Sequence, residues 1–357
     1  MSQQQQNRPG PPYRPLTAGV GGLPTIVPDV PVSAVLIAVF LGFAAANMAI
    51  FQYNRRAGRK FLPSVFLFGF CMARVATLVL RIAWAARPTN VRLSIAANIF
   101  VNAGVLIVYV LDLLFALRVL RARRPRVGWH PALRATCALL YAAIAAALVM
   151  VITAIVLSVY SLNPHTLQVC RDIQLAAGTY ILVFTTLPVF VLAAAYLLPL
   201  SGDEEAFGTG SMAAKAAIVL AVACLSMLNA GFRSGTAWAR PRPSNDPAWY
   251  HGKAPFYVFN FVVEILMLSI LTATRLDKRF YVPDGSKGPG DYSRHVALAG
   301  SNREPEGEEG ERGEEGEEGK EGEEGARGEE GEKGEKNDKD EKGEKGGKSE
   351  EGTLNNA

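Results

Sequence analysis

The sequence predicts an all-α protein, a bundle of seven transmembrane helices with a disordered N-terminal segment and a disordered acidic C-terminal tail. Long uncharged runs approach the length of about 20 apolar residues that a bilayer-spanning helix needs. Residues 301–357 carry 22 of the 33 acidic and 10 of the 37 basic residues, a net charge of −12, so residues 1–300 keep a net charge of +16. Mean hydropathy is +0.14 although 20% of residues are charged. This segregation of charge from apolar sequence excludes an ordinary soluble enzyme.

Seven spans are predicted, and together they form a transmembrane domain over residues 31–280. Pro63, Pro131 and Pro255 lie where helices should start, because a missing N–H costs little there. The four tryptophans lie at span ends or in adjacent loops, which is typical of the aromatic belts of membrane proteins. A six-span bundle is the alternative, because the second span contains Arg74 and Arg81 and the sixth is short. The spans lie at about 32–52, 62–84, 94–117, 133–158, 173–199, 213–232 and 255–274.

The short loops after the first and third spans are the most basic, so the positive-inside rule places them in the cytosol. The N-terminus is then extracellular or lumenal and the C-terminus cytosolic, in the plasma membrane or an endomembrane. Residues 1–30 are rich in Gln, Pro and Gly and are predicted to be disordered. Residues 281–300 form a juxtamembrane segment between the last span and the tail.

The tail, residues 301–357, repeats glycine at every third position from 307 to 334. Gly-X-Y is the period of collagen, but the repeat contains no proline, so a polyproline conformation is not preformed. The composition predicts a disordered, low-complexity Gly/Glu/Lys segment. The alternative is an acidic arm that binds a cytosolic protein partner or folds back onto the basic inner loops.

Ionisable side chains inside spans are expensive in a bilayer and mark candidate functional sites. Arg81 lies near the outer interface and can snorkel, whereas Asp112 is predicted to face Arg118 or Arg121. The polar faces of spans two, three and seven are predicted to turn inward, toward each other or toward water. They could form interhelical hydrogen bonds, a ligand pocket, or a proton or ion path. The candidate intramembrane polar site comprises Arg74, Arg81, Asn98, Asn102, Asp112, Asn260 and Glu264.

Arg74 and Glu264 lie at matched depths. Arg74 is 10 residues before Trp84, and Glu264 is 9 residues after Pro255. At about 1.5 Å per residue, both lie about 15 Å from the outer surface of a core roughly 30 Å thick. Opposite charges at one depth can neutralise each other, so a buried Arg74–Glu264 pair is predicted, with Asn102 or Asn260 as a hydrogen-bond partner.

Catalytic motifs are missing from the sequence. The string at 231–235 has the wrong spacing for a nucleophile elbow, and there is no Walker A or His-Glu-x-x-His motif. The four histidines are scattered and no Cys-x-x-Cys occurs, so no metal, cofactor or catalytic site is predicted. The protein is therefore predicted not to be an enzyme and not to bind nucleic acid.

Several long strings are unlike generic apolar sequence: 68–74, 87–92, 241–243, 246–250, 259–264 and 282–291. In them the sequence resembles a fungal-specific family of seven-span integral membrane proteins of unknown function, over roughly residues 11–292. The resemblance implies a multi-pass fold, and it implies that Arg74, Glu264 and the outer loop before the last span are shared features.

The predicted function is that of a receptor-like sensor whose outer half meets a small-molecule or lipid ligand, while the inner loops and tail face cytosolic partners. The alternative is a lipid or small-solute transporter or exporter that uses the inward polar faces. A third possibility is a membrane scaffold without a ligand. In each case the bilayer is the main partner.

Overall fold

The computed structural model describes residues 10–13, 17–199, 204–283 and 285–293. The predicted tail, 301–357, lies outside the described residues. The described part is helical: α1 (Asp29–Arg56), α2 (Leu62–Ala86), α3 (Val91–Gly104), α4 (Leu106–Arg123), α5 (Pro125–Gly128), α6 (Pro131–Tyr160), α7 (Pro164–Leu197), α8 (Met212–Trp238), the 3₁₀ turn η2 (Trp249–His251), α9 (Lys253–Tyr257), the π-helical turn η3 (Val258–Val262), α10 (Val263–Ala273) and α11 (Leu276–Arg279).

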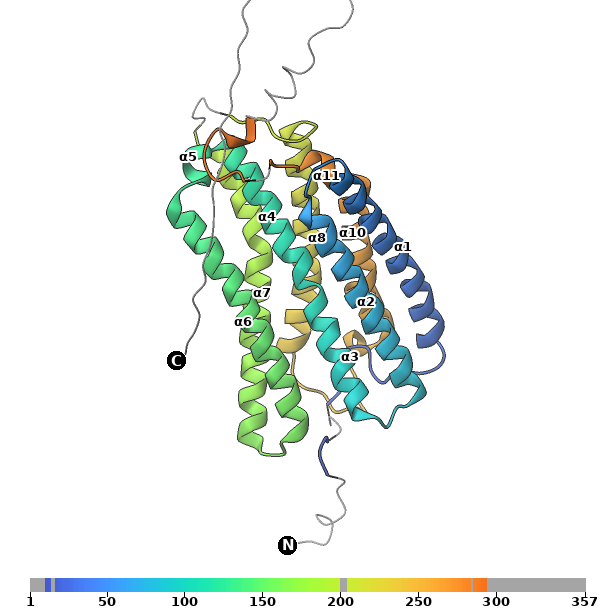
Figure 1. Ribbon diagram of the computed structural model, residues 1–357. Helices are drawn as coiled ribbons and strands as arrows, with labels where there is room; N and C mark the ends of the chain where they lie inside the picture. Colours follow the sequence, from blue (N-terminus) through green and yellow to red (C-terminus); the bar gives the residue numbers. More distant parts are fainter. Residues whose placement is uncertain (1–9, 14–16, 200–203, 284, 294–357) are drawn as a thin grey trace, which may run out of the picture. The chain divides into compact units, whose positions relative to one another are not determined.

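Seven helical segments of the described chain are long and apolar enough to cross a membrane (Figure 1). The second and sixth predicted spans are among them, so the six-span alternative is wrong. The third and seventh segments are the most enclosed, with 56% and 50% of their most apolar stretch buried, against 22% for α1 and α6. We call the end that holds residues 57–61 and α5 the inner end, after the predicted orientation, and the opposite end the outer end.

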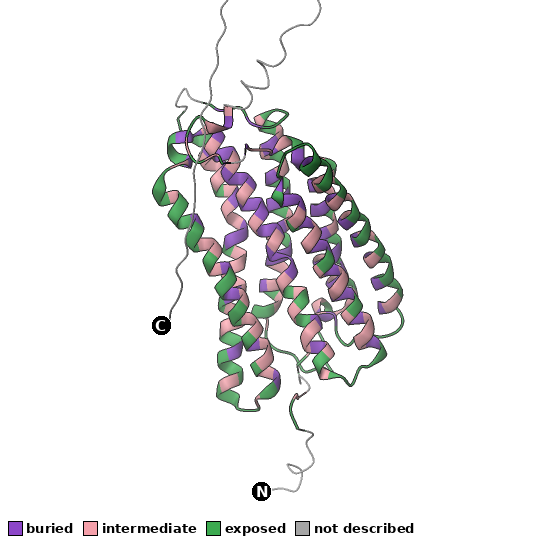
Figure 2. Cartoon of the chain, in the orientation of Figure 1, coloured by how far each residue is buried: buried purple, intermediate pink, exposed green. Residues whose placement is uncertain are grey.

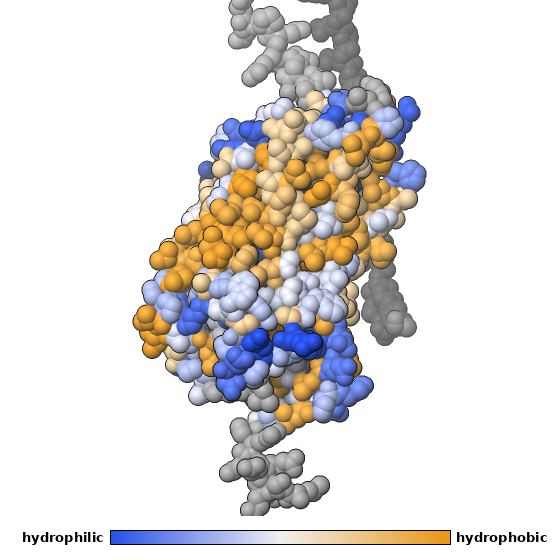
Figure 3. All heavy atoms as spheres, turned by 180° about the vertical axis from the view of Figure 1, so that it is seen from behind, coloured by the Kyte–Doolittle hydropathy of each residue, from blue (hydrophilic) through white to orange (hydrophobic). Residues whose placement is uncertain are grey.

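The surface of the bundle is that of a membrane protein. Exposed residues run along the outward faces of α1 and α6 (Figure 2), and many of them are large hydrophobic side chains such as Val35, Leu139 and Val149. One face shows a broad band of hydrophobic residues with hydrophilic residues toward both ends (Figure 3). Lipid-facing apolar side chains flanked by polar ends are what a bilayer requires.

Helix starts follow local chemistry. Proline occupies the first turn of α2, α6 and α7, and the side chain of Asn163 accepts a hydrogen bond from the His165 N–H at the start of α7. The fifth span therefore begins at Pro164, earlier than the predicted residue 173. The sixth span continues to Trp238, beyond the predicted end at 232, so it includes Arg233, which the sequence analysis assigned to a loop.

The third span, predicted as one helix over 94–117, is broken between α3 and α4 at Val105. Gly104 lies against Arg74: a Cβ added to Gly104 would be 3.3 Å from the Arg74 Nη1 atom. The break therefore lies where the guanidinium of a neighbouring helix approaches the backbone closely. The interruption divides the polar face of this span, so Asn98 and Asn102 belong to α3 and Asp112 belongs to α4.

Part of the segment predicted to be disordered is folded. Asp29 and Val30 belong to α1, and residues 17–28 cover the outer end of the bundle. The Ala18 N–H donates to the Arg242 carbonyl at 2.8 Å, and the Gly21 N–H donates to the His251 carbonyl at 3.0 Å. Backbone pairing with the outer loop before the last span holds this Gly- and Pro-rich segment in place.

The juxtamembrane segment folds against the inner end as far as it is described. Both carboxylate oxygens of Glu205 accept backbone N–H groups, from Gly290 at 2.7 Å and Tyr292 at 3.0 Å. Phe280 and Tyr292 are buried, and the ring of Phe207 contacts both of theirs. These contacts hold the described residues of this segment, 280–283 and 285–293, against the inner end.

Replacing Gly208 with alanine should loosen this inner end. Gly208 has φ +53°, and an added Cβ would lie 2.2 Å from the Arg279 carbonyl oxygen. Left-handed strain and overpacking together predict a loss of about 2–3 kcal/mol, measured as a lower thermal midpoint in detergent. Gly69→Ala is the control, because Gly69 lies within α2 with nothing within 4 Å. Equal midpoints for the two variants would contradict the expectation.

Candidate intramembrane polar site

Arg74 and Glu264 form the predicted ion pair. The Arg74 Nε and Nη2 atoms each donate to a different Glu264 carboxylate oxygen at 2.5 Å, and both side chains are 0% exposed. The guanidinium also lies 5.4 Å from the centre of the Phe70 ring and 5.8 Å from that of Phe261. A two-point pair of this kind is the favourable way to hold two charges in a low-dielectric interior.

Arg74 also bonds to the backbone near the point where the third span is interrupted. Arg74 Nη1 donates to the carbonyls of Phe100 and Val101, at 3.2 and 3.0 Å. In an unbroken helix these two carbonyls would accept from residues 104 and 105, which is where α3 ends. Arg233 of α8 donates to the same Val101 carbonyl at 2.7 Å. Two guanidinium groups therefore satisfy backbone oxygens that the break exposes.

The seventh span is irregular at the same depth. The π-helical turn η3 carries Asn260, whose Oδ1 accepts from Arg233 Nε at 2.9 Å. Asn229 of α8 donates to the Phe259 carbonyl in that turn at 2.7 Å, and its own Oδ1 accepts from the Tyr109 hydroxyl at 2.7 Å. We call this group the midplane cluster: Arg74, Tyr109, Asn229, Arg233, Asn260 and Glu264.

A second group, the outer cluster, surrounds Asp29 at the start of α1. Asp29 is fully buried and accepts from Arg81 Nη2 at 2.9 Å, the Tyr257 hydroxyl at 2.7 Å and Lys253 Nζ at 2.5 Å. Arg81 also donates to the Gly21 carbonyl at 2.8 Å. Thus Arg81 does not snorkel as predicted, because a buried counter-ion is available to it. The cluster is Asp29, Arg81, Lys253 and Tyr257.

A third group, the inner cluster, comprises Asn54, Arg275 and Asp277. Arg275 makes two bonds of 3.0 Å to the Asp277 carboxylate, which also accepts from Asn54 Nδ2 at 2.9 Å. Burial raises the pKa of Asp277, but the hydrogen bonds from Arg275 and Asn54 outweigh it, so the pKa lies below its ordinary value. The cluster ties the end of the seventh span to the end of α1.

Four of the seven predicted site residues belong to these clusters: Arg74, Arg81, Asn260 and Glu264. Asn98 and Asn102 are exposed, so they are not enclosed between helices, although Asn102 contacts Arg233 of α8. Neither Asn102 nor Asn260 bonds the ion pair as predicted. Their Oδ1 atoms accept from Arg233 instead, at 3.4 Å for Asn102.

Asp112 does not face Arg118 or Arg121. Arg118 donates to the Phe280 carbonyl and Arg121 to the Gly128 carbonyl. Both carboxylate oxygens of Asp112 are buried and have no hydrogen-bond partner within the described residues. The predicted site residues are thus divided, and Asp112, the one among them on α4, contacts none of the three clusters through a hydrogen bond.

Arg233, Asp29 and Tyr257 were missed as site residues. Arg233 had one usable signal, because Trp238 is a plausible belt residue at the outer end of the sixth span, and it would have placed Arg233 inside. Arg74 and Arg233 carry two positive charges and Glu264 one negative charge, so the midplane cluster keeps one positive charge that no carboxylate within the described residues neutralises.

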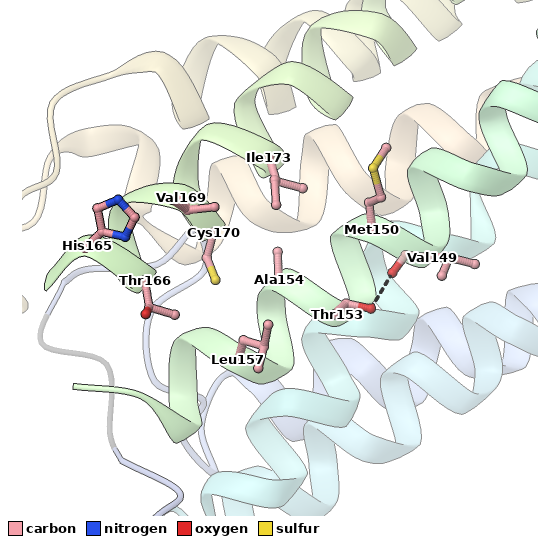
Figure 4. A pocket seen from close by; sticks show the side chains of 10 residues that line it. All are labelled: Val149, Met150, Thr153, Ala154, Leu157, His165, Thr166, Val169, Cys170 and Ile173. Atoms are coloured by element: carbon pink, nitrogen blue, oxygen red, sulfur yellow. Dashed lines mark hydrogen bonds between the residues drawn. The ribbon is translucent and has the colours of Figure 1, made fainter. Parts of the chain in front are cut away.

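Two cavities lie away from these clusters. One, of about 370 Å³, lies between the outer halves of α6 and α7 and is lined mainly by apolar side chains such as Met150, Leu157 and Ile173, with His165 and Cys170 (Figure 4). The other, of about 240 Å³, lies at the inner end. Neither is lined by a residue of the midplane cluster, so neither opens onto its charges.

Comparison with known families gives one match. Residues 125–213, which include α5, α6 and α7, match a family described as "Protein of unknown function (DUF3112)". The match covers less than half of the chain and lies outside the strings that carry the resemblance described above. No curated protein and no solved structure matches the chain. With the seven apolar helices, the match supports a multi-pass membrane protein of unknown function, and the fungal restriction stays a prediction.

Proposed function

We propose that the protein is a receptor-like sensor in which the seventh span couples the outer end of the bundle to the inner end. One observation carries the proposal: residues on or just after this span belong to all three polar clusters. Tyr257 bonds Asp29 in the outer cluster, Glu264 bonds Arg74 in the midplane cluster, and Asp277 bonds Asn54 in the inner cluster.

The π-helical turn supplies a site of movement. It lies between Tyr257 and Glu264, and such turns are frequent at functional sites within helices. A change at Tyr257 that converted the turn to regular α-helix would rotate α10 against α2 and α8. Two discrete arrangements of one packed helix are the physical requirement for transmitting a signal.

The ligand that suits the site carries a negative charge. The midplane cluster keeps one uncompensated positive charge, and Arg233 is only partly buried, beside the exposed Asn102. A carboxylate or phosphate that reached Arg233 from the outer half would neutralise that charge. It would compete with Asn260 for the guanidinium and so act on the π-helical turn.

Hydrogen exchange tests the coupling. Lys253→Gln removes one cation from Asp29 at the outer end, and we expect faster amide exchange at residues 274–283 of the inner end, with unchanged exchange in α6. Arg242→Gln is the control, because it breaks an exposed outer pair with Asp246 that lies outside the clusters. Faster exchange limited to the outer end, or spread equally over all helices, would refute the coupling.

The proposal includes the predicted orientation, with the N-terminus outside. The sequence has no Asn-x-Ser/Thr site, so any N-glycosylation detected must be on the inserted acceptor tag. A tag at residue 10 should be glycosylated and a tag at residue 300 should not, because the basic loops after the first and third spans hold the inner end in the cytosol. Modification at residue 300 alone would reverse the orientation.

A transporter is the second candidate, and Asp112 is the observation that favours it. A buried carboxyl without a hydrogen-bond partner can take up and release a proton, as coupled transporters require. Proteoliposomes under an imposed substrate gradient would then show proton uptake that Asp112→Asn abolishes. If proton uptake by the wild type equalled that of the Asp112→Asn variant and of empty vesicles, the transporter would be refuted and the sensor favoured.

A further inference from the structure

The cavity at the inner end has the features of an anion site. Its volume is about 240 Å³, and it lies between the start of α2, the last turns of α4 and the juxtamembrane residues Val282, Pro283, Gly285, Ser286 and Tyr292. Lys60, Arg118 and Arg121 line it, and within the described residues no acidic side chain does. Three positive charges therefore face one space.

None of these three cations has a carboxylate partner in the described part of the chain. Arg118 donates to the Phe280 carbonyl and lies over the Phe61 and Phe115 rings. Arg121 donates to the Gly128 carbonyl at 3.3 Å and stacks 4.8 Å from the Trp129 ring. These contacts hold the two guanidinium groups in place without neutralising them.

The start of α2 adds to this field. Phe61, Leu62 and Pro63 line the cavity, and α2 begins there without a side-chain cap. The positive end of this 25-residue helix favours an anion at this point. The helix end supports a site that the three cations already define.

The cavity borders the lipid-facing surface. Leu62, which lines it, is 57% exposed, and Phe66, one turn further along α2, is 53% exposed. A ligand with a charged head in the cavity could lay an apolar chain along these two side chains. Anionic phospholipids concentrate in the cytosolic leaflet, which the predicted orientation places at this end.

We propose that this cavity binds the phosphate headgroup of an anionic phospholipid, with the acyl chains lying along Leu62 and Phe66. The headgroup accepts from Lys60 and Arg121, while Arg118 forms the positive base of the cavity. Bound lipid would join α2, α4 and the juxtamembrane segment, and so stabilise the inner end.

Native mass spectrometry of the full chain in a neutral detergent tests the site with phosphatidic acid as the probe. We expect phosphatidic acid to bind more tightly than phosphatidylcholine with the same chains, and Lys60→Gln to weaken it about fivefold, since a basic residue near anionic lipid contributes about 1 kcal/mol. Arg121→Gln should act in the same direction. Inorganic phosphate at equal concentration should displace little lipid, because it lacks the apolar chains.

Arg59→Gln is the matched control, since Arg59 is exposed beside Lys60 and does not line the cavity. It should change the dissociation constant less than twofold, and thermal midpoints confirm that the variants are folded. Equal weakening by Arg59→Gln and Lys60→Gln would reduce the effect to general surface charge and overturn the site. Equal binding of phosphatidylcholine, or full displacement by inorganic phosphate, would overturn the lipid assignment.

Discussion

Arg74→Ala is expected to be the most damaging single change in the bundle. It leaves Glu264 charged and fully buried, and it removes the donor to the Phe100 carbonyl and one of the two donors to the Val101 carbonyl. Leaving one partner of a buried pair uncompensated costs about 3–5 kcal/mol. The expected result is a large fall in thermal midpoint and in the yield of monodisperse protein.

The double change Arg74→Ala with Glu264→Ala should recover part of this loss, because no lone charge remains. Glu264→Ala alone should be less harmful than Arg74→Ala, since Arg74 keeps its two carbonyl partners. A double-mutant cycle on thermal unfolding gives the coupling energy, which we expect to exceed about 2 kcal/mol. Arg55→Ala, a change at an exposed position in the last turn of α1, is the control. Losses that simply add would show that the two residues do not interact.

Asp29→Ala should have the second largest effect. Asp29 is 0% exposed and accepts from Arg81, Tyr257 and Lys253. Its removal leaves the buried Arg81 without a counter-ion and frees the cover formed by residues 17–28. The expected loss is about 3 kcal/mol, and limited proteolysis should cut the outer segment faster than in the wild type.

The matched control for that change is Asp246→Ala. Asp246 pairs with Arg242 at 3.2 Å in the same outer region, but the two side chains are 71% and 48% exposed. An exposed pair contributes at most about 1 kcal/mol, so this variant should melt close to the wild type. If Asp29→Ala had the same thermal midpoint as Asp246→Ala, the outer cluster would have no role in stability.

The number of spans and the central ion pair could be predicted from the sequence, each for a physical reason. The thickness of a bilayer fixes the length of a spanning apolar helix. A lone charge inside the bilayer is strongly unfavourable, so Arg74 and Glu264, which lie at one depth, are expected to pair. Depth along a helix is readable because the rise per residue is constant.

The rest of the site could not be predicted, because it depends on where helices end and break. Arg233 lies beyond the predicted end of the sixth span, but it becomes a half-buried donor within the bundle because α8 continues to Trp238. Asp29 is the first residue of α1 and residues 17–28 fold against it, which their Gly- and Pro-rich composition does not predict. Asn98 and Asn102 lie at exposed positions of α3, which ends at Gly104, where Arg74 approaches from a distant part of the chain.

The seventh span contributes to all three polar clusters, and Glu264 is its residue in the midplane cluster. The charge of Glu264 can be measured directly. Infrared difference spectra of wild type and Glu264→Gln in lipid, with glutamate labelled by ¹³C, separate ionised carboxylate from protonated carboxyl bands. An ion pair with Arg74 predicts that the variant loses an ionised carboxylate band, and that Arg74→Ala also shifts or abolishes it. Loss of only a protonated carboxyl band, with no response to Arg74→Ala, would contradict a charged pair at the centre of the bundle.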